Sequence, residues 1–351
     1  MSEDEFSNIF IRPLHKDIFP LSEIDKNIYD EVIDLTNRFC IPSQVLKNLI
    51  YDEKIKNPLI DSLSEQMLIA NLKKLINQKE LLKIANLFNL NSIEYVFMKG
   101  SAINALNDEY VRYSRDIDIL VCKKSLLMAY ELLKEIGYGY LNPLVSDSSK
   151  FTNKIHHLPV LTNGEGALVE LHHRVTKKLI YSECPLTDLM LKQPLIINKN
   201  NVDIKITNIN HTIAHLTYHA FLHHGFALGP VFLYDIKYLL GLRKDDGGLT
   251  NLLNKMGLKE DYREVIKFID KEIMIDSFKI YKVQKIKIYD QKNPKKFSYL
   301  LFTKKGRLDF WNTIKTAFMF YEDYFQTSKY SLKFYLILLE TLKRHIGRLS
   351  K

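Results

Sequence analysis

Apolar and polar residues follow two different periods along the chain, and the change of period marks its parts. Residues 22–39 and 62–88 repeat apolar side chains every three or four positions, which predicts helices with one buried side. Residues 93–100 and 116–121 are short apolar runs typical of strands. Residues 124–138 return to the helical period, so strands and helices alternate in this central part.

The same reading extends to the second half of the chain. Strands are predicted at 156–162 and 166–175, where the residues between them favour a hairpin turn, and at 202–207. From residue 208 onward nearly every segment has a helical pattern. The sequence therefore predicts an α/β fold class with a small α/β centre between two helical parts.

These patterns divide the chain into three expected regions. We expect a helical N-terminal region over 1–90, a central domain over 91–207 and a helical C-terminal domain over 208–351. Residues 271–351 hold 18 Lys and Arg against 7 Asp and Glu, whereas the rest holds 32 against 34, which accounts for the net charge of +9. The basic region after 271 predicts either a solvated lysine-rich face or contact with an anionic partner such as RNA or an acidic membrane surface.

The remaining composition narrows the class of protein. The three cysteines are widely spaced among apolar residues, which favours reduced thiols over a disulfide framework. The acidic N-terminus lacks the apolar segment of a signal peptide, and no apolar run reaches the roughly 20 residues of a transmembrane segment. We therefore expect a cytoplasmic protein with no transmembrane segment.

Acidic residues in the predicted strands carry the candidate chemistry. Asp116 and Asp118 are one residue apart, so their carboxylates lie on the same face of a strand. Such a pair is repulsive unless a divalent cation lies between the two carboxylates. If the strand that carries Glu170 lies beside them, the three carboxylates can anchor two Mg²⁺ ions, with Mn²⁺ as an alternative.

The turn before the first short helix suits a phosphate. Lys99 and Gly100 end the first strand and Ser101 opens the helix, whose free N–H groups and dipole favour an anion. Glycine lets the backbone come close to the ligand, and the serine hydroxyl can bind phosphate oxygens. Together with the acidic residues, this turn predicts a site for a nucleoside triphosphate, such as ATP, with Mg²⁺.

In this order, the strand ending in Lys-Gly-Ser, the run "RDIDILV" and the later "VELHH" resemble a known family. The chain is similar to nucleotidyltransferases of the DNA polymerase β superfamily, in particular to the uncharacterised bacterial group related to antibiotic and minimal nucleotidyltransferases. The resemblance covers about residues 93–240. It implies a polymerase-β-like palm of mixed strands, metal and catalytic roles for Asp116, Asp118 and Glu170, and triphosphate binding at Gly100 and Ser101.

The loop between the serine and the aspartates is longer than in compact members of that family. Arg112 and Arg115 lie on it and can either bind phosphates bidentately or balance the aspartates. In the alternative interpretation the acidic residues are structural: Asp116 and Asp118 pair with Arg115 and Lys123, and a histidine satisfies Glu170. Burying three acids for structure alone is energetically costly, which favours the metal site.

Histidines recur every four residues at His211, His215 and His219, on one predicted helix. Zinc binding and packing between helices are both open for this stripe, and the absence of a nearby Cys or carboxylate favours packing. His172 shares a strand face with Glu170 and is the best candidate to support the site or to contact the nucleotide. The resemblance adds His219 and Asp235 as further candidates.

The function expected from these features is Mg²⁺-dependent transfer of a nucleoside monophosphate from an NTP to a hydroxyl, with release of pyrophosphate. The acceptor is a small molecule, a protein or a tRNA, and an anionic acceptor can use the basic C-terminal region. Two alternatives stay open. One is a toxin-like enzyme that modifies tRNA, and the other is an inactive member that binds a nucleotide or a partner.

Overall fold

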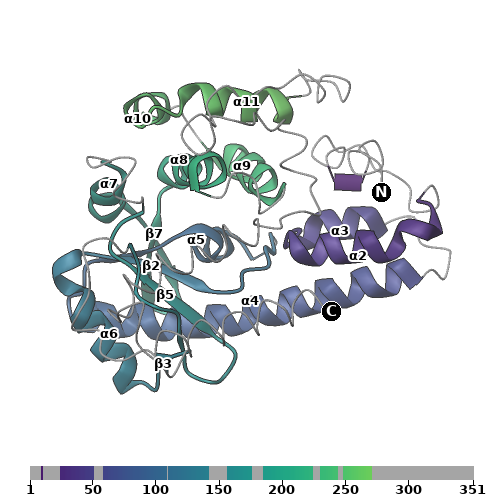
Figure 1. The fold of residues 1–351 in the computed structure, drawn as a ribbon. Helices are drawn as coiled ribbons and strands as arrows, with labels where there is room; N and C mark the ends of the chain where they lie inside the picture. The colour runs from purple at the N-terminus through teal and green to yellow at the C-terminus, as the bar shows by residue number, and fades with distance from the viewer. Residues whose placement is uncertain are drawn as a thin grey trace, which may run out of the picture.

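The chain forms a mixed α/β structure in which one sheet is covered by helices on both faces (Figure 1). The coordinates are a computed structural model. The structure describes residues 9–10, 24–50, 58–108, 110–141, 156–175, 185–223, 230–243 and 248–270. The predicted α/β fold class with a small mixed sheet and flanking helices is confirmed. The predicted basic region after 271 lies outside the described residues.

Seven strands form the sheet of the described part, in the order β3-β4-β5-β2-β1-β7-β6. Their bounds are β1 (Tyr95–Phe97), β2 (Ile117–Val121), β3 (Gly139–Tyr140), β4 (Leu161–Thr162), β5 (Leu168–His172), β6 (Pro194–Lys199) and β7 (Val202–Thr207). The central strand β2 is parallel to β5 and antiparallel to β1, while β1 is parallel to β7. The sheet is therefore mixed.

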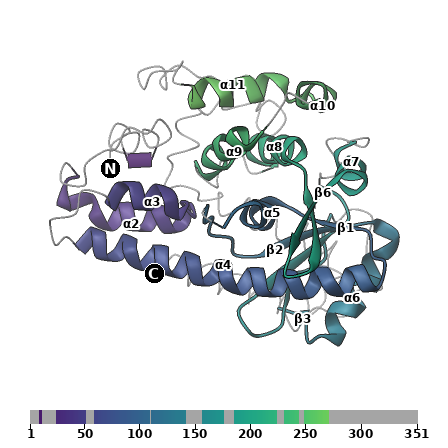
Figure 2. The ribbon, with the colours of Figure 1, turned by 180° about the vertical axis from the view of Figure 1, so that it is seen from behind.

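Helices precede, interrupt and follow the sheet. Before and within it lie α2 (Tyr29–Arg38), α3 (Ser43–Ile50), α4 (Pro58–Leu90), α5 (Lys99–Leu106), α6 (Leu126–Glu135) and α7 (Leu186–Lys192). After it come α8 (Ile209–Tyr218), a π-helical turn (His219–His223), α9 (Val231–Leu242), α10 (Leu249–Lys255) and α11 (Lys259–Ile269). Seen from behind in Figure 2, α4 runs beneath α2, α3 and α5, while α10 and α11 lie above α8 and α9.

The two faces of the sheet belong to different apolar cores. Ile117, Ile119 and Phe97 face the core that α4 and α6 complete. Val96 and Leu120 face the opposite core, which includes α7, α8 and α9. Because side chains alternate along a strand, residues 116 and 118 share the face of Leu120 and lie on the side of α8. The alternation of side chains along β2 therefore places the acidic residues on the face covered by α7, α8 and α9.

Several predicted elements differ in detail from the structure. The expected strand at 156–162 shrinks to β4 because Pro159 has no N–H to donate, although His157 still forms an isolated bridge with His172. The short strands β3 and β6 were not predicted. The β6–β7 hairpin turns at Asn200 and Asn201, which both adopt positive φ, as a tight two-residue turn requires.

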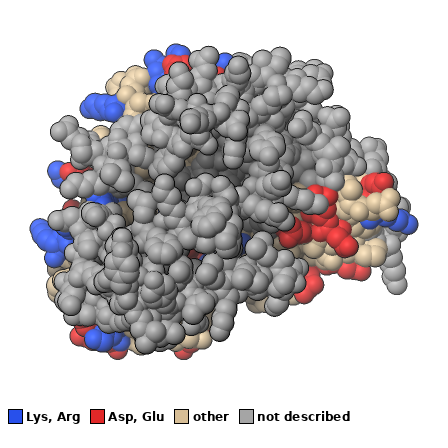
Figure 3. Space-filling view, viewed as in Figure 1, with Lys and Arg blue, Asp and Glu red and all other residues tan. Residues whose placement is uncertain are grey.

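Charge on the described surface is uneven. Figure 3 shows acidic side chains gathered at the right of the face, where α2 lies. Asp30 and Glu31 occupy the first turn of α2, where they also complement the helix dipole. An anionic acceptor would meet repulsion on this part of the surface. None of the described helices has the length and hydropathy needed to cross a membrane.

Candidate active site

The strand pairing brings two of the predicted acidic residues side by side. Asp118 on β2 and Glu170 on β5 are register partners in a parallel pair of strands. Asp116 lies just before β2, with its side chain on the same face. We call these three residues, together with Lys99 and His172, the acidic cluster. The strand that carries Glu170 therefore lies beside the strand that carries Asp118, which is the condition stated for a shared metal site.

Asp118 is the centre of the cluster. Its Oδ1 atom accepts a hydrogen bond from Lys99 Nζ at 2.6 Å and lies 3.0 Å from His172 Nε2. The same Nε2 atom is 3.3 Å from Glu170 Oε2. One imidazole nitrogen thus bridges two carboxylates, which fixes the ring orientation of a residue that is only 3% exposed.

Burial and neighbouring charges shift the pKa values of the cluster in opposite directions. Burial, reinforced by Asp118 and Glu170, raises the pKa of Asp116 to about 7. Burial also opposes ionisation of Asp118, but Lys99 and His172 outweigh it and hold the pKa of Asp118 well below its usual range. In the same way, contacts with both carboxylates overcome the burial of His172 and raise its pKa. The cluster therefore holds three acidic groups against two basic ones, and Asp116 is the carboxyl that most readily takes up a proton.

The Lys99-Gly100-Ser101 turn lies at the end of β1 beside this cluster. Lys99 adopts a positive φ of 50°, a conformation that non-glycine residues rarely adopt, as it opens α5. No side chain caps α5, so its first N–H groups are available to a ligand. Ser101 is buried, and its hydroxyl donates a long hydrogen bond of 3.4 Å to the carbonyl of Asp116.

Glycine at position 100 has a steric reason in the structure. A Cβ atom there would lie 2.7 Å from Arg112 Nη1 and 2.7 Å from Ser114 Oγ. Both distances are below those of real Cβ contacts, so Gly100 is needed for the packing of the loop against α5. Close approach to a phosphate, the reason anticipated from the sequence, remains a prediction.

Arg112 does not pair with Asp116 or Asp118, one of the two roles expected from the sequence; its partner is Asp235. Its Nε atom donates to Asp235 Oδ2 at 2.7 Å, and Asp235 also accepts from the Tyr110 hydroxyl at 3.2 Å. We call these three residues the Arg112 network. It ties the loop after α5 to α9, which leaves the Arg112 guanidinium largely buried against protein groups. Arg115, by contrast, is exposed.

Of the predicted histidine stripe, His215 lies near the acidic cluster, and none of the three histidines belongs to a metal-compatible group among the described residues. His215 is buried, and its pKa falls to about 3 through burial, helped by the charge of Lys99. His211 is also buried, and His219 packs edge-to-face against His215. Within the described residues, the metal-compatible group that emerges is Asp118, Glu170 and His172, whose ligand atoms all lie within 4.8 Å of one another.

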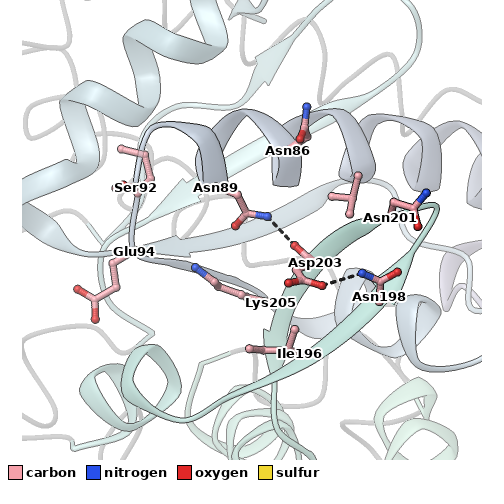
Figure 4. A pocket seen from close by; sticks show the side chains of 11 residues that line it. Asn86, Asn89, Ser92, Glu94, Ile196, Asn198, Asn201, Asp203 and Lys205 are labelled. Carbon is pink, nitrogen blue, oxygen red and sulfur yellow. Dashed lines mark hydrogen bonds between the residues drawn. The ribbon is translucent and has the colours of Figure 1, made fainter.

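A polar hollow lies at the opposite end of β1 and β7 from the acidic cluster (Figure 4). It is walled by the end of α4, by the residues before β1 and by the β6–β7 hairpin. Asp203 organises it, accepting hydrogen bonds from Asn89 at its carbonyl and from Asn198 at its carboxylate. Because the strands separate the two places, this hollow is not part of the candidate active site.

Comparison with known families agrees with the resemblance seen in the sequence. Residues 41–271, more than half of the chain, match the family described as "Uncharacterised nucleotidyltransferase". The chain belongs to this family. The nucleotidyltransferase is therefore a transferase, and both the resemblance and the expected enzyme class are confirmed.

Solved structures provide more distant similarities. One is the crystal structure of an antigenic nucleotidyltransferase-like protein from Paracoccidioides brasiliensis, 18% identical, with a TM-score of 0.34 over 56% of this chain and 91% of that one. Another is the solution structure of the antibiotic-resistance factor ANT(2'')-Ia, 12% identical, with a TM-score of 0.35 over 56% of this chain and 96% of that one. No curated protein matches the nucleotidyltransferase.

Proposed function

We propose that the nucleotidyltransferase uses Mg²⁺ to transfer a nucleoside monophosphate from an NTP to a hydroxyl of an acceptor, releasing pyrophosphate. The observation that carries this proposal is the register pairing of Asp118 with Glu170, with Asp116 beside them on the same face. Three acidic side chains at one place are costly without a bound cation. The proposal explains why the chain tolerates that cost.

The residues present fit a divalent ion. Carboxylate oxygens are the donors that Mg²⁺ prefers, and the candidate ligand atoms of Asp118, Glu170 and His172 lie within 4.8 Å of one another. Lys99 Nζ lies 2.6 Å from Asp118, so a cation is already accommodated at this carboxylate. We assign Asp116, Asp118 and Glu170 as the residues that would hold the ions. Bound there, Mg²⁺ supplies charge neutralisation and activation of the attacking oxygen.

The side chains of the protein supply the remaining functions. The uncapped N–H groups at the start of α5 would bind and orient the triphosphate, assisted by the Ser101 hydroxyl and by the ammonium of Lys99, which contacts Asp118. Glu170 accepts the proton of the acceptor hydroxyl. His172, which contacts both Asp118 and Glu170, is a positioning residue that fixes the two carboxylates.

We further propose that this chemistry belongs to a palm domain over residues 91–207, with helical regions over 1–90 and 208–351 around it. The acceptor is a small molecule, a protein or an RNA. Arg115 is exposed near the cluster and is the arginine best placed to reach substrate phosphates. Arg112 instead positions the loop through its pairing with Asp235.

The test is transfer of radioactive label. The purified protein is incubated with each of the four α-labelled NTPs, with Mg²⁺ or EDTA, and with separate metabolite, protein and RNA fractions. We expect Mg²⁺-dependent label in one fraction together with released pyrophosphate. Failure to release pyrophosphate with all four NTPs and all fractions would overturn the proposal, whereas nucleotide binding without turnover would favour the inactive-member alternative.

A further inference from the structure

Helix α4 carries polar residues on its inner side over its middle turns, the reverse of an ordinary surface helix. Gln66, Lys74, Asn77 and Glu80 are all buried. Each meets a specific partner: for example, the Lys74 ammonium donates to the carbonyl oxygens that follow α5 at 2.8–3.4 Å. Each of these side chains therefore makes at least one hydrogen bond, although Asn77 Oδ1 has no partner among the described residues. The large apolar residues of these turns lie on another side of the helix.

Those apolar residues lie on the outer side of the same turns. Large exposed side chains follow one another at Leu68 (59% exposed), Ile69 (47%), Leu72 (51%), Leu75 (61%) and Ile76 (38%). At 100° per residue they cover about 120° of the helix surface, opposite the buried polar residues. We call them the outer stripe of α4. A contiguous apolar patch of this kind marks an interaction surface.

The spacing of the stripe indicates what kind of surface packs against it. Along the outer side, residues follow steps of four and three in strict alternation, at Asp61, Glu65, Leu68, Leu72, Leu75 and Lys79. Steps that average 3.5 residues keep one seam facing a neighbouring helix, as in a left-handed coiled coil. The expected occupant is therefore another helix that crosses α4 at a shallow angle.

The charges at the two ends of the stripe identify that helix. Glu65 and Lys79 lie seven residues on either side of Leu72, and Asp61 and Lys83 lie eleven residues on either side. An antiparallel copy of α4 related by a two-fold axis at Leu72 would therefore place each acidic residue opposite a lysine. A parallel copy would place like charges together.

The apolar residues obey the same symmetry. Leu68 would face Ile76 of the second copy, Ile69 would face Leu75, and Leu72 would face itself. We infer that the nucleotidyltransferase forms a homodimer through the outer stripes of two antiparallel α4 helices. Such self-complementarity of one surface is what an isologous two-fold interface requires.

The surroundings of α4 leave this side accessible among the described elements. Among the described elements α4 contacts α2, α3, α5, α6 and β7, whereas the residues of the outer stripe are 38–61% exposed. Figures 1 and 2 both show α2, α3 and α5 above α4, in views from opposite sides. The acidic cluster lies on the far face of the sheet, so this inference does not rest on the proposed function.

The first test measures mass by sedimentation equilibrium of the full chain. We expect the wild-type protein to have twice the monomer mass at micromolar concentration. Leu72→Glu would place two carboxylates at the axis and should raise the dissociation constant at least tenfold. The control Leu90→Glu changes an exposed residue of α4 outside the stripe and should leave the dimer intact.

The second test uses the predicted charge pairing. Glu65→Lys and Lys79→Glu should each weaken the dimer, because each creates two like-charged contacts across the axis. The combined variant E65K/K79E should restore it, since the opposite pairs are re-formed with exchanged signs. Only a partner with the same substitutions can show this recovery, so it distinguishes a second copy from any other occupant.

Two results would overturn the inference. A wild-type chain that stays monomeric up to 100 μM would mean that residues 271–351 or another protein cover the stripe. A dimer that survives Leu72→Glu, with native circular dichroism in both proteins, would mean that the copies meet elsewhere.

Discussion

The acidic cluster and the Arg112 network are both buried arrangements of charge, but their balance differs. The acidic cluster sets three carboxylates against one ammonium and one imidazole, whereas the Arg112 network sets the single carboxylate of Asp235 against the guanidinium of Arg112. The Tyr110 hydroxyl adds a hydrogen bond to Asp235 without changing the charge. The acidic cluster has one acidic group more than it has basic groups, whereas the Arg112 network has one of each.

This difference separates a ligand site from a structural bridge. An excess of buried charge is unfavourable until a ligand compensates it, so removing one member should harm activity more than stability. A balanced pair satisfies itself, so removing one member should harm stability first. The two arrangements lie close together, because Arg112 also packs against Gly100, and mutations can therefore test them in one protein.

The largest effect is expected from Asp116→Asn. Nucleotidyl transfer should fall by about 10³-fold or more because the ions lose a ligand. Thermal stability should stay equal or rise, since Asp116 is repelled by Asp118 and Glu170. Transfer rate and melting temperature are the two measurements. Glu94→Gln, at the opposite end of β1, is the control that should retain activity, and an active Asp116→Asn protein would remove our assignment.

Breaking the Arg112 network should lower stability more than activity. Asp235→Asn leaves Arg112 buried without its counter-charge, which should lower the free energy of unfolding by roughly 3–5 kcal/mol. The double variant R112M/D235N should recover part of this loss because no unpaired charge remains. Denaturant unfolding measures both. If Asp235→Asn kept full stability but lost activity, Asp235 would belong with the acidic cluster instead.

Gly100→Ala tests the contact between the two arrangements. The new Cβ atom would collide with Arg112 and Ser114, so we expect a loss of about 1–3 kcal/mol in unfolding free energy. Weaker NTP binding should follow, measured by calorimetry. The matched control is Gly241→Ala in α9, where a Cβ meets nothing within 4 Å and the higher helix propensity of alanine should stabilise slightly. Equal effects of the two variants would contradict the packing role.

The smallest effect concerns pH. Burial lowers the pKa of His211 to about 4, whereas the unfolded chain takes up a proton near pH 6.5. The stability that neutral His211 contributes is therefore complete above pH 6.5 and is lost as the pH falls toward 4. Between pH 7 and 5.5 we expect a loss of about 1 kcal/mol, which His211→Gln should reduce. Melting curves at both pH values check this, and parallel pH profiles would contradict it.

Much of the candidate site could be predicted from the sequence because short local patterns identify its residues. The strand periodicity placed Asp116 and Asp118 on one face, and Glu170 in a second apolar run could be expected nearby. The family resemblance supplied the rest of the expectation, and the family and mixed fold are confirmed. The catalytic roles and the three domain boundaries remain predictions.

What the sequence did not reveal depends on contacts between distant residues. Arg112 and Asp235 are separated by 123 positions, and nothing in the local pattern of either residue indicates the other. The buried Lys74 was equally hidden, because a lysine within a helix usually faces water. The β6–β7 hairpin, by contrast, had a readable signal in its Asn200-Asn201 turn between alternating residues.

Helix α4 holds the segment that supports Gly100, since Lys74 binds carbonyls of that segment and Asn77 donates to the carbonyl of Ser114 at 3.0 Å. The outer stripe occupies the other side of the same turns. A helix with its side chains is about 10 Å thick. A partner that binds the outer stripe would therefore lie only one helix diameter from Lys74 and Asn77, the residues that hold the segment packed against Gly100.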